Sequence, residues 1–332
     1  MTANDRPSTD TTETVDLGDE VYAIDTRMAG CPGITSSYLI RAEKPCLVEV
    51  GAAGSAPLLR DRVAALGVAP EDLATVAVTH IHLDHAGGTG DIAAMFPNAT
   101  IVVHENGARH LAQPERLIRS ARQVFGAAFD TLFGDLVPTD PARIQAVGER
   151  GSIDLGGGRE LATHFTPGHA KHHIGLVDSQ NGDLYVGDAL GIYDARTGEV
   201  HPATPPPDFD LDAARATFDL LSDIAPRRLM FSHFAASRDT GRLLDLAREE
   251  LHHWVETVRE AHSGPGDLDH AVALVRERVT SRYQEPAEPA DERTREVLDI
   301  LSGPEPNTAG IWHWLDRLAA QQRAERDGDV RQ

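Results

Sequence analysis

The stretch Thr79-His80-Ile81-His82-Leu83-Asp84-His85-Ala86-Gly87-Gly88 organises this chain, because it places three histidines and one aspartate within positions 80 to 85. The apolar run over 75–78 predicts a buried strand that ends at His80. The following glycines predict a loose link before a helix over 91–96. Neutral imidazole and carboxylate groups are common ligands of zinc-like ions. The stretch therefore predicts a metal site, with His80 and His82 turned toward one ion and Asp84 and His85 toward a second.

The pattern His-x-His-x-Asp-His followed by Ala-Gly-Gly resembles the signature of the metallo-β-lactamase-fold hydrolases, which include glyoxalase II-like thioesterases and lactonases. The resemblance covers roughly residues 17–236 and implies an α/β (α+β) fold, a four-layer αββα sandwich. Residues 1–16 are expected to form a disordered tail, residues 105–150 a helical insertion that packs on the core or walls the site, and residues 237–332 a helical C-terminal extension.

The same resemblance implies the remaining metal ligands. His169 follows Thr166-Pro167-Gly168 as the third histidine of the family does, and Asp188 follows a predicted hairpin where the family has its bridging carboxylate. His233 follows a predicted strand over 228–231 and matches the final ligand. The implied set is His80, His82 and His169 for one ion, Asp84, His85 and His233 for the other, and Asp188 between them. The expected cofactor is two divalent ions, with Zn²⁺ first and iron or manganese as alternatives.

Four further residues have expected roles near the site. The resemblance implies that His173 braces the ligands, whereas His172 has no family counterpart and is interpreted as a loop histidine. Glu49 stands near a position where the family usually has a bracing aspartate, so it is either a brace or a surface acid at a strand end. Tyr193 is a candidate hydrogen-bond donor to the oxyanion or leaving group, or a packed tyrosine. Asp84 is expected to orient the attacking water or accept its proton as well as bind metal.

The predicted activity is hydrolysis of an ester, thioester or lactone by a hydroxide generated between two ions. One alternative is a mononuclear iron sulfur (persulfide) dioxygenase on the same fold, which does not require His233 as a ligand. Another is a non-catalytic binding module with the C-terminal helices as its surface. For a glutathione thioester, Lys171 and Arg227-Arg228 are candidates for the basic patch that would bind the peptide carboxylates.

The expected partner is a small-molecule substrate, and a homodimer is left open. With 31 Lys and Arg against 52 Asp and Glu, the net charge of −21 disfavours nucleic acid. No apolar run approaches the roughly 20 residues of a membrane span, and the polar N-terminus lacks a signal-peptide pattern, so a cytoplasmic enzyme is expected. The two cysteines, Cys31 and Cys46, are too few for a disulfide framework.

The remaining pattern predicts alternating strands and helices and then helices alone. Strands are expected over 21–25, 37–41, 46–50, 100–104, 152–155, 160–165, 175–177 and 183–186. Helices are expected over 56–66, 105–111, 115–133 and 211–224, the last capped near Asp210. The proline-rich stretch 200–210 is either a pocket rim or a linker. Beyond residue 238 a long helix is followed by helices over 268–283, 292–301 and 309–324, with breaks at Pro286, Pro289, Pro304 and Pro306.

Overall fold

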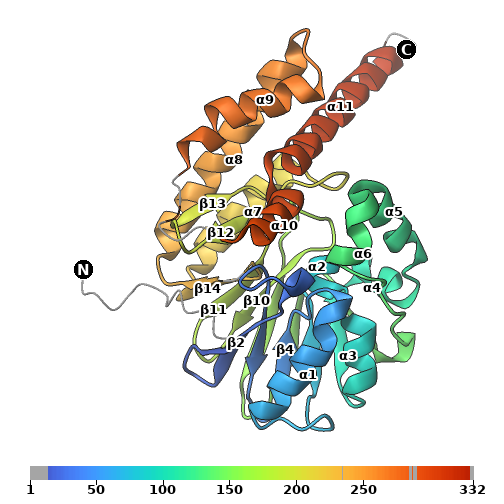
Figure 1. Cartoon of the computed structure of the whole chain (residues 1–332), viewed down its shortest axis with the longest axis vertical. Helices are drawn as coiled ribbons and strands as arrows, with labels where there is room; N and C mark the ends of the chain where they lie inside the picture. Colours follow the sequence, from blue (N-terminus) through green and yellow to red (C-terminus); the bar gives the residue numbers. More distant parts are fainter. Residues whose placement is uncertain (1–13, 234, 284–285, 287–289, 330–332) are drawn as a thin grey trace.

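Two mixed β-sheets pack face to face between helical layers in the computed structural model (Figure 1), which describes residues 14–233, 235–283, 286 and 290–329. The first sheet has the order β1 (Thr14–Asp16), β2 (Val21–Asp25), β3 (Ser36–Ile40), β4 (Cys46–Val48), β5 (Thr75–Ala77), β6 (Thr100–His104) and β7 (Ile144–Val147). Its neighbours from β1 to β4 are antiparallel, and those from β4 to β7 are parallel.

The second sheet has the order β15 (Ala235–Ser237), β14 (Arg228–Phe231), β11 (Asp183–Gly187), β10 (Ile174–Asp178), β9 (Glu160–Phe165) and β8 (Arg150–Asp154). Only β11 and β14 run parallel in it. A separate hairpin, β12 (Ile192–Asp194) with β13 (Glu199–His201), follows β11 and was not anticipated from the sequence. The expected four-layer sandwich with a C-terminal helical region is confirmed.

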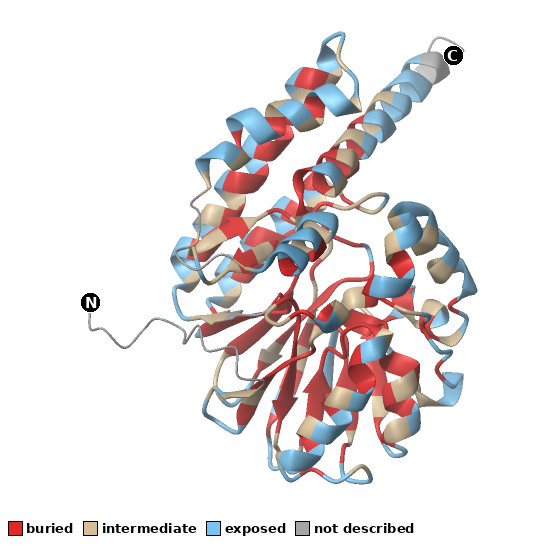
Figure 2. Cartoon of the chain, viewed as in Figure 1, coloured by how far each residue is buried: buried red, intermediate tan, exposed pale blue. Residues whose placement is uncertain are grey.

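Three apolar clusters hold the layers together, and the alternation of strand side chains divides residues between them. In β3, Tyr38 and Ile40 point into the cluster between the sheets, whereas Leu39 faces the cluster under the helices α1 (Ala56–Ala65) and α3 (Thr89–Met95). The third cluster lies under α7 (Leu211–Ile224) and α8 (Thr240–Ser263). Figure 2 shows that the buried residues gather in the sheets and on the helix faces turned toward them.

The helical insertion packs on the first sheet, as one of its two interpretations predicts. It contains α4 (Glu105–Ala112), α5 (Glu115–Phe125), the 3₁₀ turn η3 (Gly126–Ala128) and α6 (Phe129–Leu132). Phe129, Leu132 and Phe133 are buried in the cluster of that sheet. The single helix expected over 115–133 is wrong, because the chain breaks at Gly126, whose φ is +51°. The insertion also ends earlier than the expected boundary near 150, since β7 pairs in parallel with β6.

The C-terminal helices are α8, α9 (Leu268–Arg278), the 3₁₀ turn η5 (Thr280–Arg282), α10 (Glu292–Ser302) and α11 (Pro304–Asp329). Helices α8, α9 and α11 pack on one another, whereas α10 contacts the first sheet's cluster through Val297. The helix expected to start at Ala309 starts at Pro304. Pro304 and Pro306 lie in its first turn, where a missing N–H costs no hydrogen bond.

Three smaller expectations are also resolved. Residues 14–16 of the expected tail form β1, and residues 1–13 lie outside the described part, as does Pro289. Cys31 and Cys46 are both buried and unbridged. Among the described residues, no helix combines the length and apolar character needed to cross a membrane.

Candidate metal centre

The motif residues lie where the first sheet meets the second, just beyond the end of β5. His80 and His82 follow the strand, and a single helical turn, α2 (Leu83–Ala86), carries Asp84 and His85. The expectation of a loose glycine link is wrong. A Cβ atom on Gly87 would lie 3.0 Å from the Ala52 Cα atom, and one on Gly88 would lie 3.1 Å from the Val50 carbonyl oxygen, so the glycines permit a close approach of backbone segments.

Three imidazole nitrogens converge on one point. The Nδ1 atom of His82 lies 3.1 Å from Nε2 of His80 and 2.9 Å from Nε2 of His169. Three nitrogens bound tetrahedrally to one zinc ion lie about 3.3 Å apart, since each Zn–N bond is about 2.0–2.1 Å. The cluster therefore has close to the spacing of a three-histidine site, and all three residues come from positions expected from the sequence.

A second cluster lies beside the first and shares Asp188 with it. The Nε2 atom of His85 lies 3.4 Å from Oδ2 of Asp84, and Nε2 of His233 lies 3.7 Å from the same oxygen. Oδ2 of Asp188 lies 3.5 Å from Nε2 of His85, 3.6 Å from Nε2 of His233 and 3.7 Å from Nε2 of His169. One carboxylate oxygen thus lies between the two clusters, and the structure brings together all seven residues of the expected set.

The chemistry of these side chains fits two bound cations. Among the described residues, both ring nitrogens of His85, Oδ1 of Asp188 and Nδ1 of His233 are buried without a hydrogen-bond partner. Buried polar atoms without partners are costly and rare in folded proteins. Cations between the clusters would give Nε2 of His85 and the Asp188 carboxylate their missing partners.

The charge states of the ligands also suit metal binding. Burial, followed by repulsion from His169, lowers the pKa of His82 to about 4, and burial lowers the pKa of His80 and of His169. Although burial raises the pKa of Asp84, His85 and His233 together outweigh that effect and bring it to about 2. These side chains are therefore in their metal-binding forms at neutral pH.

His85 behaves differently. Burial lowers its pKa, but the nearby carboxylates of Asp188 and Asp84 outweigh burial and hold the pKa well above its usual range. The metal-free site therefore keeps a proton on His85, and a cation must displace that proton to bind.

Glu49 braces the ligand loops, and its interpretation as a surface acid is wrong. It is 1% exposed, and its Oε1 atom accepts hydrogen bonds from the hydroxyl groups of Thr79, at 2.5 Å, and Ser232, at 3.0 Å. The same oxygen lies 3.6 Å from Nδ1 of His85. Thr79 and Ser232 directly precede the predicted ligands at 80 and 233, so one carboxylate fixes three ligand segments. The hydroxyl residues just before His80 and His233 are a signal visible in the sequence that was not used to predict this brace.

His173 braces Asp188, as expected. Its Nε2 atom accepts a hydrogen bond from the backbone N–H of Asp188 at 3.1 Å, so its Nδ1–H faces the Thr166 hydroxyl at 2.7 Å. Gly187 makes this contact possible. Its φ is +54°, and a Cβ atom there would lie 2.4 Å from Nε2 of His173.

His172 is a buried neighbour of the site, and the interpretation as an ordinary loop histidine misses this role. Its Nδ1 atom faces the backbone N–H of Ile81 at 3.4 Å, and its ring stacks on that of His80 with centroids 6.2 Å apart. Its Nε2 atom lies 3.9 Å from Oδ2 of Asp208. The proline-rich stretch therefore reaches the metal loop through His172.

The proline-rich stretch also holds His169 and forms a cavity rim, as one of its two interpretations predicts. The carbonyl oxygen of Ala203 accepts a hydrogen bond from Nδ1 of His169 at 2.8 Å, which leaves Nε2 free for a metal. A backbone carbonyl has no signature in a sequence, so this contact was not foreseen.

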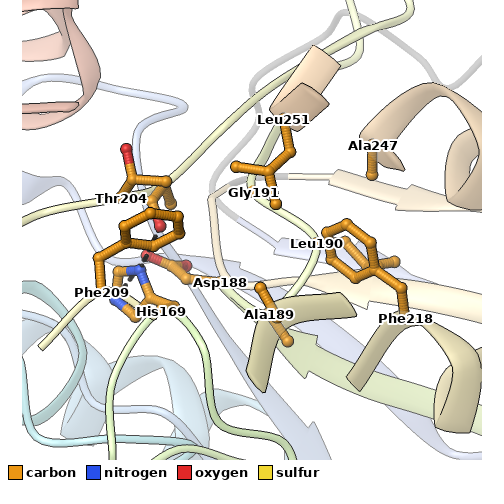
Figure 3. A pocket seen from close by; sticks show the side chains of 12 residues that line it. His169, Asp188, Ala189, Leu190, Gly191, Thr204, Phe209, Phe218, Ala247 and Leu251 are labelled. Atoms are coloured by element: carbon orange, nitrogen blue, oxygen red, sulfur yellow. Dashed lines mark hydrogen bonds and ion pairs between the residues drawn. The ribbon is translucent and has the colours of Figure 1, made fainter. Parts of the chain in front are cut away.

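A small cavity of about 20 Å³, enough for a water molecule, adjoins this contact (Figure 3). The residues that line it include His169, Asp188, Leu190, Thr204, Phe209 and Phe218.

Tyr193, the remaining predicted catalytic residue, packs against β14. Tyr193 is 8% exposed, its ring lies 5.3 Å from that of Phe231, and its hydroxyl contacts Ser237. Its catalytic role stays a prediction.

The proposed basic patch at Arg227-Arg228 is wrong. Both guanidinium groups bind the buried Asp183 at the start of β11 and β14, whereas the site lies beyond the other end of these strands. Lys171 is exposed and pairs with Asp208 at 2.8 Å.

The fold is an αββα sandwich, with two mixed sheets between helical layers. Its histidine and aspartate cluster lies beyond the ends of the strands, where it could hold metal ions. A model of the metallo-β-lactamase superfamily matches residues 32–233, and the chain belongs to that superfamily.

Individual relatives are distant. The metallo-β-lactamase fold-containing protein ST1585 of Sulfurisphaera tokodaii is 32% identical over 135 residues, which are 40% of this chain and 49% of the relative. The solved structure of ST1585 superposes with a TM-score of 0.65 at 20% identity, covering 89% of this chain and 98% of that chain, and shows the shared fold.

Two relatives carry named activities. N-acyl homoserine lactonase AttM of Rhizobium radiobacter is 31% identical over 122 residues, 35% of this chain and 40% of the relative. A hydroxyacylglutathione hydrolase of Synechococcus sp. (strain JA-3-3Ab) is 25% identical over 182 residues, 54% of this chain and 58% of the relative. With ST1585, these matches cover about half of each relative's length.

Proposed function

We propose that the protein is a dinuclear metal-dependent hydrolase that acts on an ester, thioester or lactone, with Zn²⁺ as its ion. The observation that carries the proposal is the position of the Asp188 Oδ2 atom, which lies 3.5–3.7 Å from the Nε2 atoms of His85, His233 and His169. An oxygen between two ligand clusters is the arrangement that a pair of adjacent ions requires.

When bound, such ions supply a hydroxide nucleophile at neutral pH and a Lewis acid for the carbonyl oxygen of the substrate. The chain supplies the rest. His80, His82 and His169 hold one ion, and Asp84, His85 and His233 hold the other. Asp84 is the most exposed of the carboxylates, at 13% of its side chain, so it can also orient the attacking water and accept its proton.

The substrate class draws support from the relatives with named activities. A lactonase and a hydroxyacylglutathione hydrolase share sequence with this chain over 122 and 182 residues. A lactone and a glutathione thioester are both carboxylic acid derivatives with an electrophilic carbonyl carbon, which is the group that a metal-generated hydroxide attacks. Tyr193 is proposed as a donor to the oxyanion or leaving group, with its hydroxyl moving from Ser237 to do so.

The test joins metal analysis to substrate assays. Protein purified without chelator should contain about two zinc ions per chain and hydrolyse members of a panel of lactones, esters and thioesters. Asp188→Ala should abolish hydrolysis and lower the metal content. Asp212→Ala, a change of the same kind at a side chain that is 84% exposed, should leave both unaltered. Full hydrolysis by Asp188→Ala would contradict the proposal.

The iron dioxygenase alternative gives a different result in the same preparation. That enzyme would contain one iron per chain, consume oxygen with glutathione persulfide, and tolerate replacement of His233. The packing of His233 against Asp84 and Asp188 favours the dinuclear site.

A further inference from the structure

The C-terminal helix α11 makes direct contact with the stretch that holds His169. Asn307, in the first turn of α11, is 2% exposed, and its Oδ1 atom accepts a hydrogen bond from the backbone N–H of Thr204 at 2.6 Å. The backbone oxygen of Asn307 accepts a second hydrogen bond, from the Thr204 hydroxyl at 3.0 Å. Asn307 lies outside residues 32–233, the region matched by the family model, whereas Thr204 and the metal centre lie within it. These contacts therefore connect the C-terminal extension to the metal centre.

The N–H group of Thr204 and the carbonyl group of Ala203 belong to the same peptide unit. A peptide unit is planar, so a hydrogen bond on one side fixes the direction of the group on the other. His169 donates to the Ala203 oxygen at 2.8 Å, while Asn307 accepts from the Thr204 nitrogen at 2.6 Å. The peptide unit is therefore held between a predicted metal ligand and a residue of the C-terminal extension.

The Asn307 side chain is itself fixed. Its Nδ2 atom donates to the carbonyl oxygens of Ser302 at 2.9 Å and Gly303 at 3.2 Å, at the end of α10. Because both amide hydrogens are used there, the amide oxygen must face Thr204. Gly310, one turn along α11, allows the close approach, since a Cβ atom there would lie 1.7 Å from the Thr204 carbonyl oxygen.

From this geometry we infer that Asn307 is a positioning residue for the metal centre, which acts on His169 through the Ala203–Thr204 peptide unit. Successive hydrogen bonds polarise one another, so the bond that the Thr204 N–H donates to Asn307 makes the Ala203 carbonyl a stronger acceptor for His169. An acceptor on Nδ1 fixes the ring's orientation and makes Nε2 a better metal ligand. The inference rests on the proposed function, because it needs a metal at His169.

The decisive measurement is zinc affinity, by competition with a chromophoric chelator, on the full-length chain. Asn307→Leu removes the acceptor and should weaken zinc binding at one of the two sites by about 10- to 100-fold, the usual effect of losing such a partner. With Co²⁺ in place of zinc, the visible spectrum of that site should change. Asn307→Asp keeps an oxygen that can accept from Thr204 but loses the bonds to Ser302 and Gly303, so it should restore only part of the affinity.

Two control variants separate positioning from simple anchoring of the helix. Thr204→Val removes the hydroxyl bond to Asn307 and keeps the peptide N–H. Arg317→Ala removes another contact of α11 with the same stretch, the 2.6 Å hydrogen bond to the Phe209 carbonyl oxygen. Both should retain wild-type zinc affinity.

The outcomes are distinct. Wild-type affinity in Asn307→Leu, or equal losses in Thr204→Val and Arg317→Ala, would overturn the inference and leave the proposed function intact. If Asn307→Leu does not fold, Asn307→Asp decides, because a folded Asp variant that shows the full loss of about 10- to 100-fold contradicts the role of the acceptor. A wild-type chain that binds no zinc would contradict the proposed function and this inference together.

Discussion

The Oε1 atom of Glu49 lies 3.0 Å from the hydroxyl oxygen of Ser232, although 183 positions separate the two residues. Glu49 also has a φ of +65°, a strained conformation for a residue with a side chain, which costs of order 1–3 kcal/mol. The surrounding bonds to Thr79 and Ser232 maintain it. The longer side chain at this position thus performs the bracing that the family resemblance assigns to an aspartate.

Replacing Glu49 with glutamine should weaken zinc binding by about 10- to 100-fold. The change removes the negative charge beside Nδ1 of His85 and places two amide hydrogens where the Oε2 atom has no hydrogen-bond partner among the described residues. Affinity is measured by chelator competition. Glu71→Gln, at an exposed carboxylate, is the matched control. Equal zinc affinity in Glu49→Gln and Glu71→Gln would contradict the bracing role of Glu49.

Replacing Gly187 with alanine should destabilise the fold and lower the metal content. The new methyl group would lie 2.4 Å from Nε2 of His173 and 2.6 Å from the Thr79 hydroxyl, so both supports of the ligands would shift. Gly182→Ala is the control, because its φ is also positive, at +73°, but its new Cβ atom would lie 3.5 Å from the Arg227 Cβ atom, an ordinary contact. The control should cost about 1–2 kcal/mol for the left-handed conformation alone. Urea unfolding and metal analysis should show a larger cost, with metal loss, only in Gly187→Ala.

Replacing Arg159 with alanine should lower the free energy of unfolding by about 3–5 kcal/mol, because it leaves a buried carboxylate without its partner. The Asp178 side chain is fully buried and receives hydrogen bonds from Nε and Nη2 of Arg159. Arg242→Ala removes an ion pair whose side chains are more than half exposed, so it should change that free energy by less than about 1 kcal/mol. Urea denaturation of both variants provides the measurement, and similar losses in the two would show that burial does not set the cost.

Zinc binding near neutral pH should release about one proton per chain from the ligands, in addition to any proton released when metal-bound water becomes hydroxide. The proton comes from His85, whose pKa is held up by Asp188 and Asp84 despite burial, whereas burial keeps His80, His82 and His169 neutral. Since the raised pKa favours the protonated, metal-free site, apparent affinity should fall about tenfold for each unit that the pH drops below that pKa. Titration calorimetry in buffers of different ionisation enthalpy counts the protons, and a count of zero would contradict the charge assignment.

The sequence predicted the ligand segments well because each has a local signal. The motif after β5, the Thr-Pro-Gly-His turn and the aspartate after β11 are all compact patterns at strand ends. The helix α7 begins where its cap predicts, since the Asp210 side chain accepts a hydrogen bond from the N–H of Ala213.

What the sequence did not reveal depends partly on contacts between a side chain and a backbone group that lies far away along the chain. His169 donates to the Ala203 carbonyl oxygen, and the backbone N–H of Thr204 donates to Oδ1 of Asn307, so each bond has one main-chain partner whose position leaves no trace in residue type. Strand β7 was assigned to the insertion because its exposed positions hide the alternation typical of strands. The short helix α2 was missed because four residues are too few to show helical periodicity.

The seven residues of the centre are divided between the two halves of the sandwich. Those at positions 80 to 85 follow β5 of the first sheet, whereas His169, Asp188 and His233 follow β9, β11 and β14 of the second. If the chain were divided between β7 and β8, neither fragment would possess a complete set of donors for either ion. Full metal occupancy would then require the two fragments to associate. Because the ions bind only the associated fragments with full affinity, they would stabilise that complex.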